Sequence, residues 1–340
     1  MNYEQSASQA RGQMGEWCKA CPVCNGKACG NKIPGPGAKG LGEVASRNYQ
    51  AWQQRYLVMD TIHDEFTASC EATLLGRSLS VPVMIGPVGD VNRHYSDKYN
   101  TVTYNSAILR AADDAGTLAW TGDGLDATIM TRALTLIEEL GGRGVPTIKP
   151  WSMDVVNEKL DAALAARPAA IAMDIDAAGL PFLRGQQPPA GAKTVAQLTK
   201  IAQHCHDAGI PFVLKGIMSV AGARKAAEAQ ADAIVVSNHG GRVLDGVPAT
   251  ADVLPQIASE VQGELQVLVD GGIRSGTDVF RALALGADAV LICRPFVVAA
   301  FGAGEEGIRG YLDQLSGELT DCMEMCGAKT VQDITREMVV

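Results

Sequence analysis

The stretch that decides the fold is Ala233-Ile234-Val235-Val236-Ser237-Asn238-His239-Gly240-Gly241-Arg242-Val243-Leu244-Asp245. Its first four residues are apolar and mostly β-branched, which is typical of a short buried strand. Polar residues follow at once, so a histidine and an arginine lie at the end of one strand. Histidine can accept a proton near neutral pH, and arginine can hold a carboxylate through two parallel hydrogen bonds. The stretch therefore predicts a strand that delivers a proton acceptor and an anion-binding group to one place.

The same alternation of a short apolar run and a longer amphipathic segment continues over most of the chain. The segments 219–230 and 277–285, for example, have the apolar spacing of helices. Such alternation predicts a parallel sheet with helical crossovers, and eight units match a closed (β/α)₈ TIM barrel of ~250 residues. A doubly wound open sheet is the alternative, but its usual Gly-x-Gly-x-x-Gly turn is missing after the first run. The eight apolar runs are 81–85, 117–120, 145–148, 170–173, 212–214, 233–236, 267–269 and 290–292.

Composition limits the kinds of partner that the chain binds. We expect an N-terminal extension over residues 1–80 and the barrel over residues 81–340. Lys and Arg number 29 against 38 Asp and Glu, a net charge of −9 that argues against nucleic acid or an anionic membrane as the main partner. No apolar run approaches the roughly 18 residues of a membrane span, and the polar residues 1–17 do not resemble a secretory signal. These features predict a cytoplasmic protein.

Polar residues follow the later apolar runs directly. Lys215 follows the fifth run, Asp270-Gly271-Gly272-Ile273-Arg274 the seventh and Cys293-Arg294 the eighth. In a barrel these positions converge on one rim, and phosphate often binds after strands seven and eight. Gly271 and Gly272 expose their backbone N–H groups ahead of a helix, and Arg274 and Arg294 add positive charge. The sequence therefore predicts a phosphate site at this rim. Asp174 and Asp176 follow the fourth run, where they are expected to bind a metal or substrate or to pair with a nearby base.

With these motifs the sequence resembles the FMN-dependent 2-hydroxy-acid oxidoreductases, the family of glycolate oxidase, lactate oxidase and mandelate dehydrogenase. The resemblance is dense over residues 212–296 and thinner over residues 81–120. It is carried by Lys215-Gly216-Ile217, Ser237-Asn238-His239-Gly240-Gly241-Arg242, Val247-Pro248-Ala249-Thr250, Asp270-Gly271-Gly272-Ile273-Arg274, Ala282-Leu283-Ala284-Leu285-Gly286-Ala287 and Arg294-Pro295, with Ile85-Gly86-Pro87-Val88-Gly89 resembling the turn along the flavin.

The resemblance implies the oxidation of a small anionic 2-hydroxy acid to the 2-oxo acid. His239 would take the hydroxyl proton as hydride leaves for flavin N5, Arg242 would hold the carboxylate, and Lys215 would stabilise negative charge on the reduced ring. The electron acceptor stays unknown, and the family suggests a homo-oligomer, a tetramer or an octamer. The implied cofactor-binding residues are Pro87, Val88, Gly89, Lys149, Lys215, Ser237, His239, Gly240, Asp270, Gly271, Gly272, Arg274, Cys293 and Arg294.

The chain departs from the family pattern on the substrate side. Lys149 stands where the family usually has a substrate-contacting tyrosine after the third strand. Arg184 is a loose counterpart of the family's second carboxylate-binding arginine, and the N-terminal substrate tyrosine has no clear match. We therefore expect Lys149 and Arg184 to bind substrate, and the substrate to be an altered 2-hydroxy acid. The alternatives are an FMN barrel of another reaction type, such as an isomerase, and a catalytically lapsed flavin- or metal-binding barrel.

Four cysteines near the N-terminus lie outside the family pattern. Cys18, Cys21, Cys24 and Cys29 have the spacing Cys-x₂-Cys-x₂-Cys-x₄-Cys. Four thiols within a dozen residues can enclose one tetrahedral metal or one cluster. The two-residue spacing resembles iron–sulfur ligation, and Cys-Pro-x-Cys-x-Gly resembles a zinc knuckle, so zinc and iron–sulfur both remain open. The other five cysteines are interpreted as buried thiols.

Overall fold

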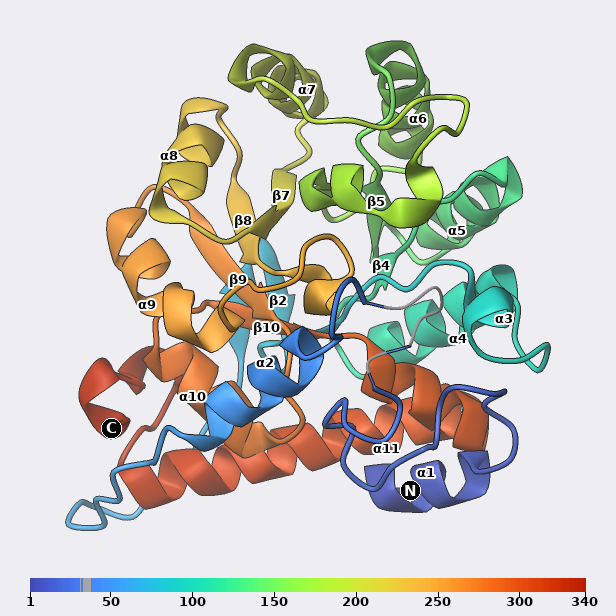
Figure 1. The fold of residues 1–340 in the computed structure, drawn as a ribbon. Coiled ribbons are helices and arrows are strands. Elements are labelled where there is room, and N and C mark those ends of the chain that lie inside the picture. The colour runs from blue at the N-terminus through green and yellow to red at the C-terminus, as the bar shows by residue number, and fades with distance from the viewer. Residues whose placement is uncertain (31, 33–37) are drawn as a thin grey trace.

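The computed structural model describes residues 1–30, 32 and 38–340, and it contains a ring of eight parallel strands (Figure 1). The strands follow the order β3-β10-β9-β8-β7-β6-β5-β4. Neighbours in the ring are therefore consecutive strands of the barrel, except that the last strand, β10, pairs with the first, β3. The ring closes where Ile85 pairs with Ala119 and donates its backbone N–H to the Leu118 carbonyl at 3.1 Å. The predicted (β/α)₈ barrel is therefore confirmed. Its strands are β3 (Val83–Ile85), β4 (Trp120–Thr121), β5 (Val145–Ile148), β6 (Ile171–Asp174), β7 (Phe212–Ile217), β8 (Ala233–Val236), β9 (Gln266–Asp270) and β10 (Ala289–Ile292).

Helices surround the ring, which explains why its strands are apolar runs. All four residues of β8 are buried, because the strands of a parallel barrel are covered on both faces. The surrounding helices are α3 (Val91–His94), α4 (Thr101–Asp114), α5 (Ala127–Glu139), α6 (Met153–Ala165), α7 (Val195–Asp207), α8 (Val220–Glu228), α9 (Thr250–Glu260), α10 (Gly276–Ala284) and α11 (Arg294–Cys326). Short 3₁₀ turns are η1 (Ile175–Gly179), η2 (Pro181–Leu183), η3 (His239–Gly241), η4 (Val331–Asp333) and η5 (Arg336–Met338). None of the helices in the described part of the chain has the length and apolar character that crossing a membrane requires.

A β-hairpin closes the amino-terminal end of the barrel. It consists of β1 (Ala72–Leu74) and β2 (Arg77–Leu79), paired antiparallel. Leu74, Leu75 and Leu79 are buried in the same apolar cluster as the inward-facing residues of the barrel strands. The backbone N–H of Leu75 also donates to the side chain of Gln266 at the start of β9, at 2.7 Å. The interior is therefore filled by side chains at this end, which leaves the carboxyl ends of the strands for a site.

Two further helices precede the barrel and lie at different places on it (Figure 1). Helix α1 (Tyr3–Ala10) packs along α11, where the rings of Tyr3 and Tyr311 lie 4.8 Å apart. Helix α2 (Val44–Gln53) lies over the loops that follow β8 and β9. The N-terminal residues therefore contact the carboxyl-terminal rim directly. The boundary at residue 80 stays a prediction.

Candidate active site

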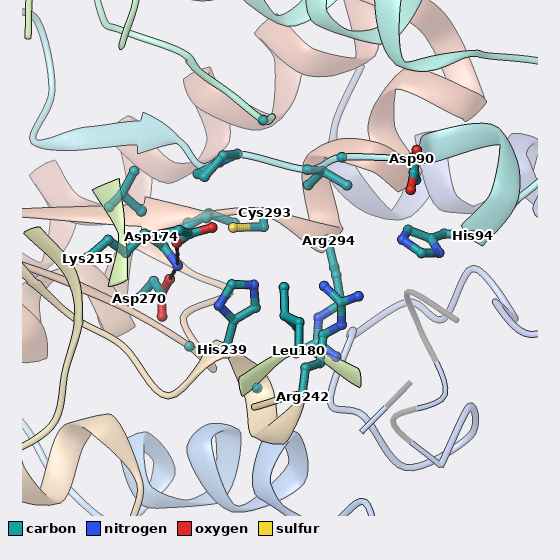
Figure 2. Close-up of a pocket in the computed structure, with 18 of the residues that line it drawn as sticks. Asp90, His94, Asp174, Leu180, Lys215, His239, Arg242, Asp270, Cys293 and Arg294 are labelled. Atoms are coloured by element: carbon teal, nitrogen blue, oxygen red, sulfur yellow. Dashed lines mark ion pairs between the residues drawn. The ribbon is translucent and has the colours of Figure 1, made fainter. Parts of the chain in front are cut away.

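A cavity opens at the carboxyl ends of the barrel strands (Figure 2), and the empty space in it and its open mouth is about 1020 Å³. The structure brings together at its wall every predicted cofactor-binding residue except Ser237, along with Arg242. The lining consists of Pro87, Val88, Gly89, Asp90, His94, Gly122, Asp123, Lys149, Asp174, Leu180, Phe182, Lys215, His239, Gly240, Arg242, Asp270, Gly271, Gly272, Arg274, Leu291, Ile292, Cys293 and Arg294.

Two predicted residues lie outside this wall. Ser237 is fully buried behind it, and its Oγ accepts hydrogen bonds from Lys215 Nζ and from the backbone N–H of His239, each at 3.3 Å. Arg184 is exposed at the end of η2 and does not line the cavity. Ser237 therefore supports two cavity residues from below. Substrate binding by Arg184 stays a prediction that would require the loop after η2 to approach the cavity.

Lys215 is held between two carboxylates at the bottom of the cavity. Its Nζ lies 3.1 Å from Asp174 Oδ1 and 3.3 Å from Asp270 Oδ2, and all three side chains are less than 10% exposed. Burial disfavours the charged form of Lys215, but the two carboxylates outweigh it and raise the pKa well above its ordinary value. Burial likewise acts against the charge of Asp174, yet Lys215, His239 and Lys149 hold its pKa well below the usual range. The cavity therefore contains a fixed ammonium group that stays charged.

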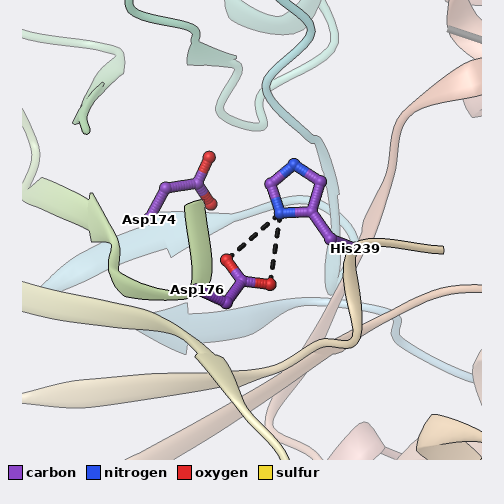
Figure 3. A group of neighbouring side chains, drawn as sticks. All are labelled: Asp174, Asp176 and His239. Carbon is purple, nitrogen blue, oxygen red and sulfur yellow. Dashed lines mark hydrogen bonds and ion pairs between the residues drawn. The ribbon is translucent and has the colours of Figure 1, made fainter. Parts of the chain in front are cut away.

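His239 is oriented by a carboxylate from the loop after β6 (Figure 3). Its Nδ1 lies 3.1 Å from Asp176 Oδ1 and 3.2 Å from Asp176 Oδ2. Gly216, with a φ of +106°, makes room for this carboxylate, because a Cβ there would lie 2.5 Å from Asp176 Cγ. His239 itself has a φ of +54°, a left-handed conformation that non-glycine residues rarely adopt and that recurs at functional sites. With Nδ1 engaged, Nε2 is the nitrogen left to exchange a proton.

Asp174, Asp176 and His239 also form a candidate cation site, since one ligand atom of each lies within 4.8 Å of the others. Lys215 Nζ already places a positive charge 3.1 Å from Asp174 Oδ1. Like charges repel strongly at such distances in a buried setting. The group is therefore better described as an ion pair of Lys215 with Asp174 and a hydrogen bond between His239 Nδ1 and Asp176 than as a metal site. This answers the question that the sequence left open for the two aspartates.

Arg242 is a half-buried cation with one buried nitrogen that lacks a hydrogen-bond partner among the described residues. This nitrogen is Nε, and the guanidinium lies 5.9 Å from the centre of the Phe182 ring. Burial lowers the pKa of Arg242 to about 10. In Figure 2 its guanidinium points into the same part of the cavity as that of Arg294. A buried donor without an acceptor costs free energy, so this position is suited to an anionic ligand.

The glycines after β9 serve close packing as well as the cavity. Gly271 and Gly272 have φ values of +91° and +88°, and a Cβ on Gly272 would lie 2.4 Å from the carbonyl carbon of Asn48 in α2. The side-chain amides of Asn48 and Asn238 donate to each other at 2.8 Å. Trp52 Nε1 donates to the Gly271 carbonyl at 2.8 Å. Helix α2 therefore fixes the two loops that carry His239 and the glycines, a role that the sequence did not reveal.

Asp123, at the end of β4, organises the wall that carries Lys149. Its Oδ2 accepts from the backbone N–H of Lys149 at 3.1 Å and from Trp151 Nε1 at 2.6 Å, and its Oδ1 accepts from Lys159 Nζ at 2.8 Å. Sequence reasoning missed Asp123, although it follows the second apolar run just as Lys215 follows the fifth. The other lining residues that it missed include Asp90, His94, Gly122, Leu180 and Phe182.

The cysteines fall into two groups. Cys70, Cys205, Cys322 and Cys326 are buried, whereas Cys293 is only partly buried, lines the cavity and has a pKa raised to about 12 by burial. The predicted metal ligands Cys18, Cys21, Cys24 and Cys29 are partly exposed free thiols. Within the described residues, no three of these four sulfurs lie within 4.8 Å of one another. The loop would therefore have to draw its sulfurs together to enclose an ion.

The fold and the site together define a class: a (β/α)₈ barrel whose rim cavity holds a cation at its floor, an oriented histidine and several anion-binding groups. The family model for FMN-dependent dehydrogenases matches residues 36–186 and 183–340. The chain belongs to this FMN-dependent dehydrogenase family.

Individual relatives agree with this assignment. The chain is 49% identical over 130 residues to the peroxisomal (S)-2-hydroxyacid oxidase GLO3 of Arabidopsis thaliana, covering 38% of this chain and 36% of that protein. It is 52% identical over 130 residues to an L-lactate dehydrogenase of Stenotrophomonas maltophilia, covering 38% and 34%. The matches therefore span little more than a third of the length of these curated relatives.

Solved structures extend the likeness over nearly the whole chain. A mandelate oxidase variant with 2-hydroxy-phenylacetamide has a TM-score of 0.79 at 28% identity, covering 98% of this chain and 96% of that one. A mandelate oxidase variant with a monooxide FMN adduct has a TM-score of 0.75 at 30% identity, covering 90% and 96%. The barrel and the N-terminal residues before it thus follow an architecture seen in FMN-containing proteins.

Proposed function

We propose that this chain uses FMN, bound in the rim cavity, to oxidise a 2-hydroxy acid to the 2-oxo acid. The observation that carries the proposal is the placement of His239, oriented through Nδ1 by Asp176, in the same cavity as Arg242, whose buried Nε lacks a partner. A 2-hydroxy acid offers one hydroxyl proton to a base and one carboxylate to a cation. The hydroxyl group matches the base, His239, and the carboxylate matches the cation, Arg242.

The residues present fit FMN. Among the lining residues, Arg274 and Arg294 suit its phosphate, and Lys215 and the segment Pro87–Gly89 suit its ring. When bound, FMN supplies the acceptor for the two electrons that leave the substrate carbon. Lys215 would hold a positive charge where the reduced ring becomes negative. We assign the substrate carboxylate to Arg242 and the hydroxyl proton to His239 Nε2.

An anaerobic screen tests this function. The purified chain with FMN is mixed with a panel of 2-hydroxy acids, and loss of the flavin's visible absorbance reports its reduction. We expect bleaching by at least one acid, and the Arg242→Met variant should need a much higher concentration of it. The absence of bleaching by every acid would refute the reaction class. Net conversion of a substrate without any electron acceptor would indicate the isomerase-type reaction instead.

Changing Asp176 to asparagine should lower kcat by roughly 10²-fold or more, because an amide can hold His239 in the wrong tautomer and no longer stabilises its protonated form. KM should change little, since Asp176 does not line the cavity. Stopped-flow reduction of bound FMN would measure the effect. Asp161→Asn is the matched control, because Asp161 pairs with His204 at 3.0 Å on the surface. Equal rates for the Asp176 variant and the native chain would contradict the assigned role.

We propose that Lys149 selects the substrate. It is a buried cation in the lining, and Asp123 fixes its backbone. Methionine has a side chain of similar length to that of lysine but carries no charge. Changing Lys149 to methionine should lower kcat/KM for the preferred acid roughly tenfold or more, as expected for a lost hydrogen bond to a charged group. The preference among 2-hydroxy acids should change with it. An unchanged preference would show that Lys149 faces the cofactor and not the substrate.

We also propose that Cys18, Cys21, Cys24 and Cys29 bind one zinc ion or one iron–sulfur cluster. Their support is the ligand type and spacing together with their state as partly exposed free thiols in one short loop. Metal analysis and a visible spectrum of protein purified without oxygen or chelator distinguish the two. The absence of both iron and zinc would refute the site.

A further inference from the structure

The segment that carries the four cysteines, residues 18–29 (the cysteine loop), lies beside the arginines assigned to phosphate. We infer that metal binding by this loop and FMN binding by the cavity strengthen each other. The loop then acts as a metal-dependent part of the cavity wall beside Arg274 and Arg294, the two arginines assigned to the FMN phosphate. The inference rests on the proposed binding of FMN and of a metal. It adds a coupling between the two sites that neither binding event implies by itself.

The first contact between the sites is a hydrogen bond. Arg274 lines the cavity, and its Nε donates to the backbone carbonyl of Cys24 at 2.5 Å. Its Nη1 donates to the Ile273 carbonyl, so Nη2 is the guanidinium nitrogen for which these bonds give no partner. The orientation of the Arg274 fork therefore depends on where the cysteine loop places one of its own carbonyl groups.

A second contact runs through helix α2. Gly26 of the cysteine loop, with a φ of +77°, lies so close to the first turn of α2 that a Cβ there would be 3.2 Å from Ala45 Cβ. The same helix holds the cavity loops through the Asn48–Asn238 and Trp52–Gly271 hydrogen bonds. A shift of the cysteine loop would therefore press on the helix that positions the glycines after β9.

The second arginine assigned to the phosphate also lies near the loop. Arg294 lines the cavity, and Cys24 and Cys29 are close enough to interact with its charge.

The loop by itself has little to hold its shape. Residues 18–29 contain turns and bends but no helix or strand, so few backbone hydrogen bonds offset the entropy of ordering them. Metal ligation would supply that order, since ligand binding and folding are coupled in small cysteine sites. An ordered loop offers a fixed Cys24 carbonyl to Arg274, and a cavity with its arginines in place loses less entropy when it binds phosphate. Linkage then requires FMN to favour metal binding by the same factor.

The test compares the FMN affinity of the full chain with and without metal. Protein stripped by a chelator under anaerobic, reducing conditions is divided, one half is reloaded with Zn²⁺, and both are titrated with FMN by fluorescence quenching. We expect the Kd for FMN to be about tenfold lower in the zinc form. The reciprocal titration should show tighter Zn²⁺ binding in the presence of FMN.

Variants identify the origin of the effect. Cys24→Ser should remove the zinc dependence of FMN binding, whereas Cys70→Ser, a buried cysteine whose Sγ lies 3.2 Å from Thr320 Oγ1, should keep it. Arg274→Lys keeps a positive charge but loses the Nε donor, so FMN should bind more weakly and with a smaller zinc dependence.

Equal or weaker FMN binding in the zinc form would overturn the coupling while leaving the proposed function intact. A chain that binds FMN but neither zinc nor iron would also overturn it. Failure of both forms to bind FMN would instead refute the proposed function, and the coupling with it.

Discussion

Replacement of His239 by glutamine is expected to slow the reduction of bound FMN by roughly 10²–10⁴-fold, the usual contribution of a general base. Glutamine keeps a polar side chain at this left-handed position but cannot accept the hydroxyl proton near neutral pH. FMN should remain bound, because Arg274, Arg294 and Lys215 are unchanged. Anaerobic stopped-flow absorbance with the acid found in the screen measures the rate constant directly.

The control for this variant is His204→Gln. His204 lies on α7, and its side chain is 41% exposed and pairs with Asp161 at 3.0 Å. It does not line the cavity. Its replacement should leave the reduction rate unchanged. A His239→Gln enzyme that reduces FMN at the native rate would show that another group takes the proton, and the assignment of the base would be withdrawn.

Replacement of Lys215 by methionine should produce the largest loss of stability, about 3–5 kcal/mol, the usual cost of breaking a buried ion pair. Methionine has a similar length, so packing is kept while Asp174 and Asp270 are left buried without their cation at 3.1 and 3.3 Å. Urea denaturation of the variant and the native chain, both without FMN, measures the difference in free energy of unfolding.

This loss should depend on pH with a definite sign. In the native chain the pKa of Asp174 is depressed, so its contribution to stability is present above the unfolded pKa of ~3.9 and is lost as the pH falls. Without Lys215, burial favours the protonated form of Asp174, and its pKa should rise above the unfolded value. The difference between variant and native chain should therefore be largest at neutral pH and shrink toward about pH 4.

Lys225→Met provides a matched control for the same substitution. Lys225 is exposed on α8, and such surface changes usually alter stability by less than about 0.5 kcal/mol. The double variant Asp174→Asn with Lys215→Met should recover part of the loss, because one unpaired charge is removed. If Lys215→Met were as stable as the native chain at every pH, the three side chains would not form the buried ion-pair group described here.

The barrel was predictable because its strands are short apolar runs at regular intervals. β8 illustrates this, since its four buried residues coincide with the run Ala233–Val236. The strand-end rule then located the part of the cavity wall that follows the last four strands, including Lys215, His239 and Arg294. It worked because a barrel forces residues that follow different strands onto one rim. Applied to the second apolar run, the same rule would have found Asp123.

Contacts between distant segments were not predictable in this way. Asn48 and Asn238 are 190 residues apart, and nothing local in α2 shows that its asparagine pairs with the loop after β8. The roles of Asp174 and Asp176 also stayed open, because their spacing does not tell which one meets Lys215 and which meets His239. The 3₁₀ turn η1 decides this by moving Asp176 away from the line of β6. Tertiary geometry, not residue type, made these assignments.

The leucine-filled hairpin at the far end of the barrel has a practical consequence for engineering. Leu74, Leu75 and Leu79 seal the amino-terminal end with apolar packing, and none of them borders the cavity. The apolar packing of the hairpin and the residues of the cavity therefore lie at opposite ends of the barrel. Substitutions that stabilise the packing around the hairpin can therefore be made without changing the cavity. A protein stabilised in this way first should tolerate more destabilising substitutions of Lys149, Leu180 or Phe182, which would change the substrates that the cavity accepts.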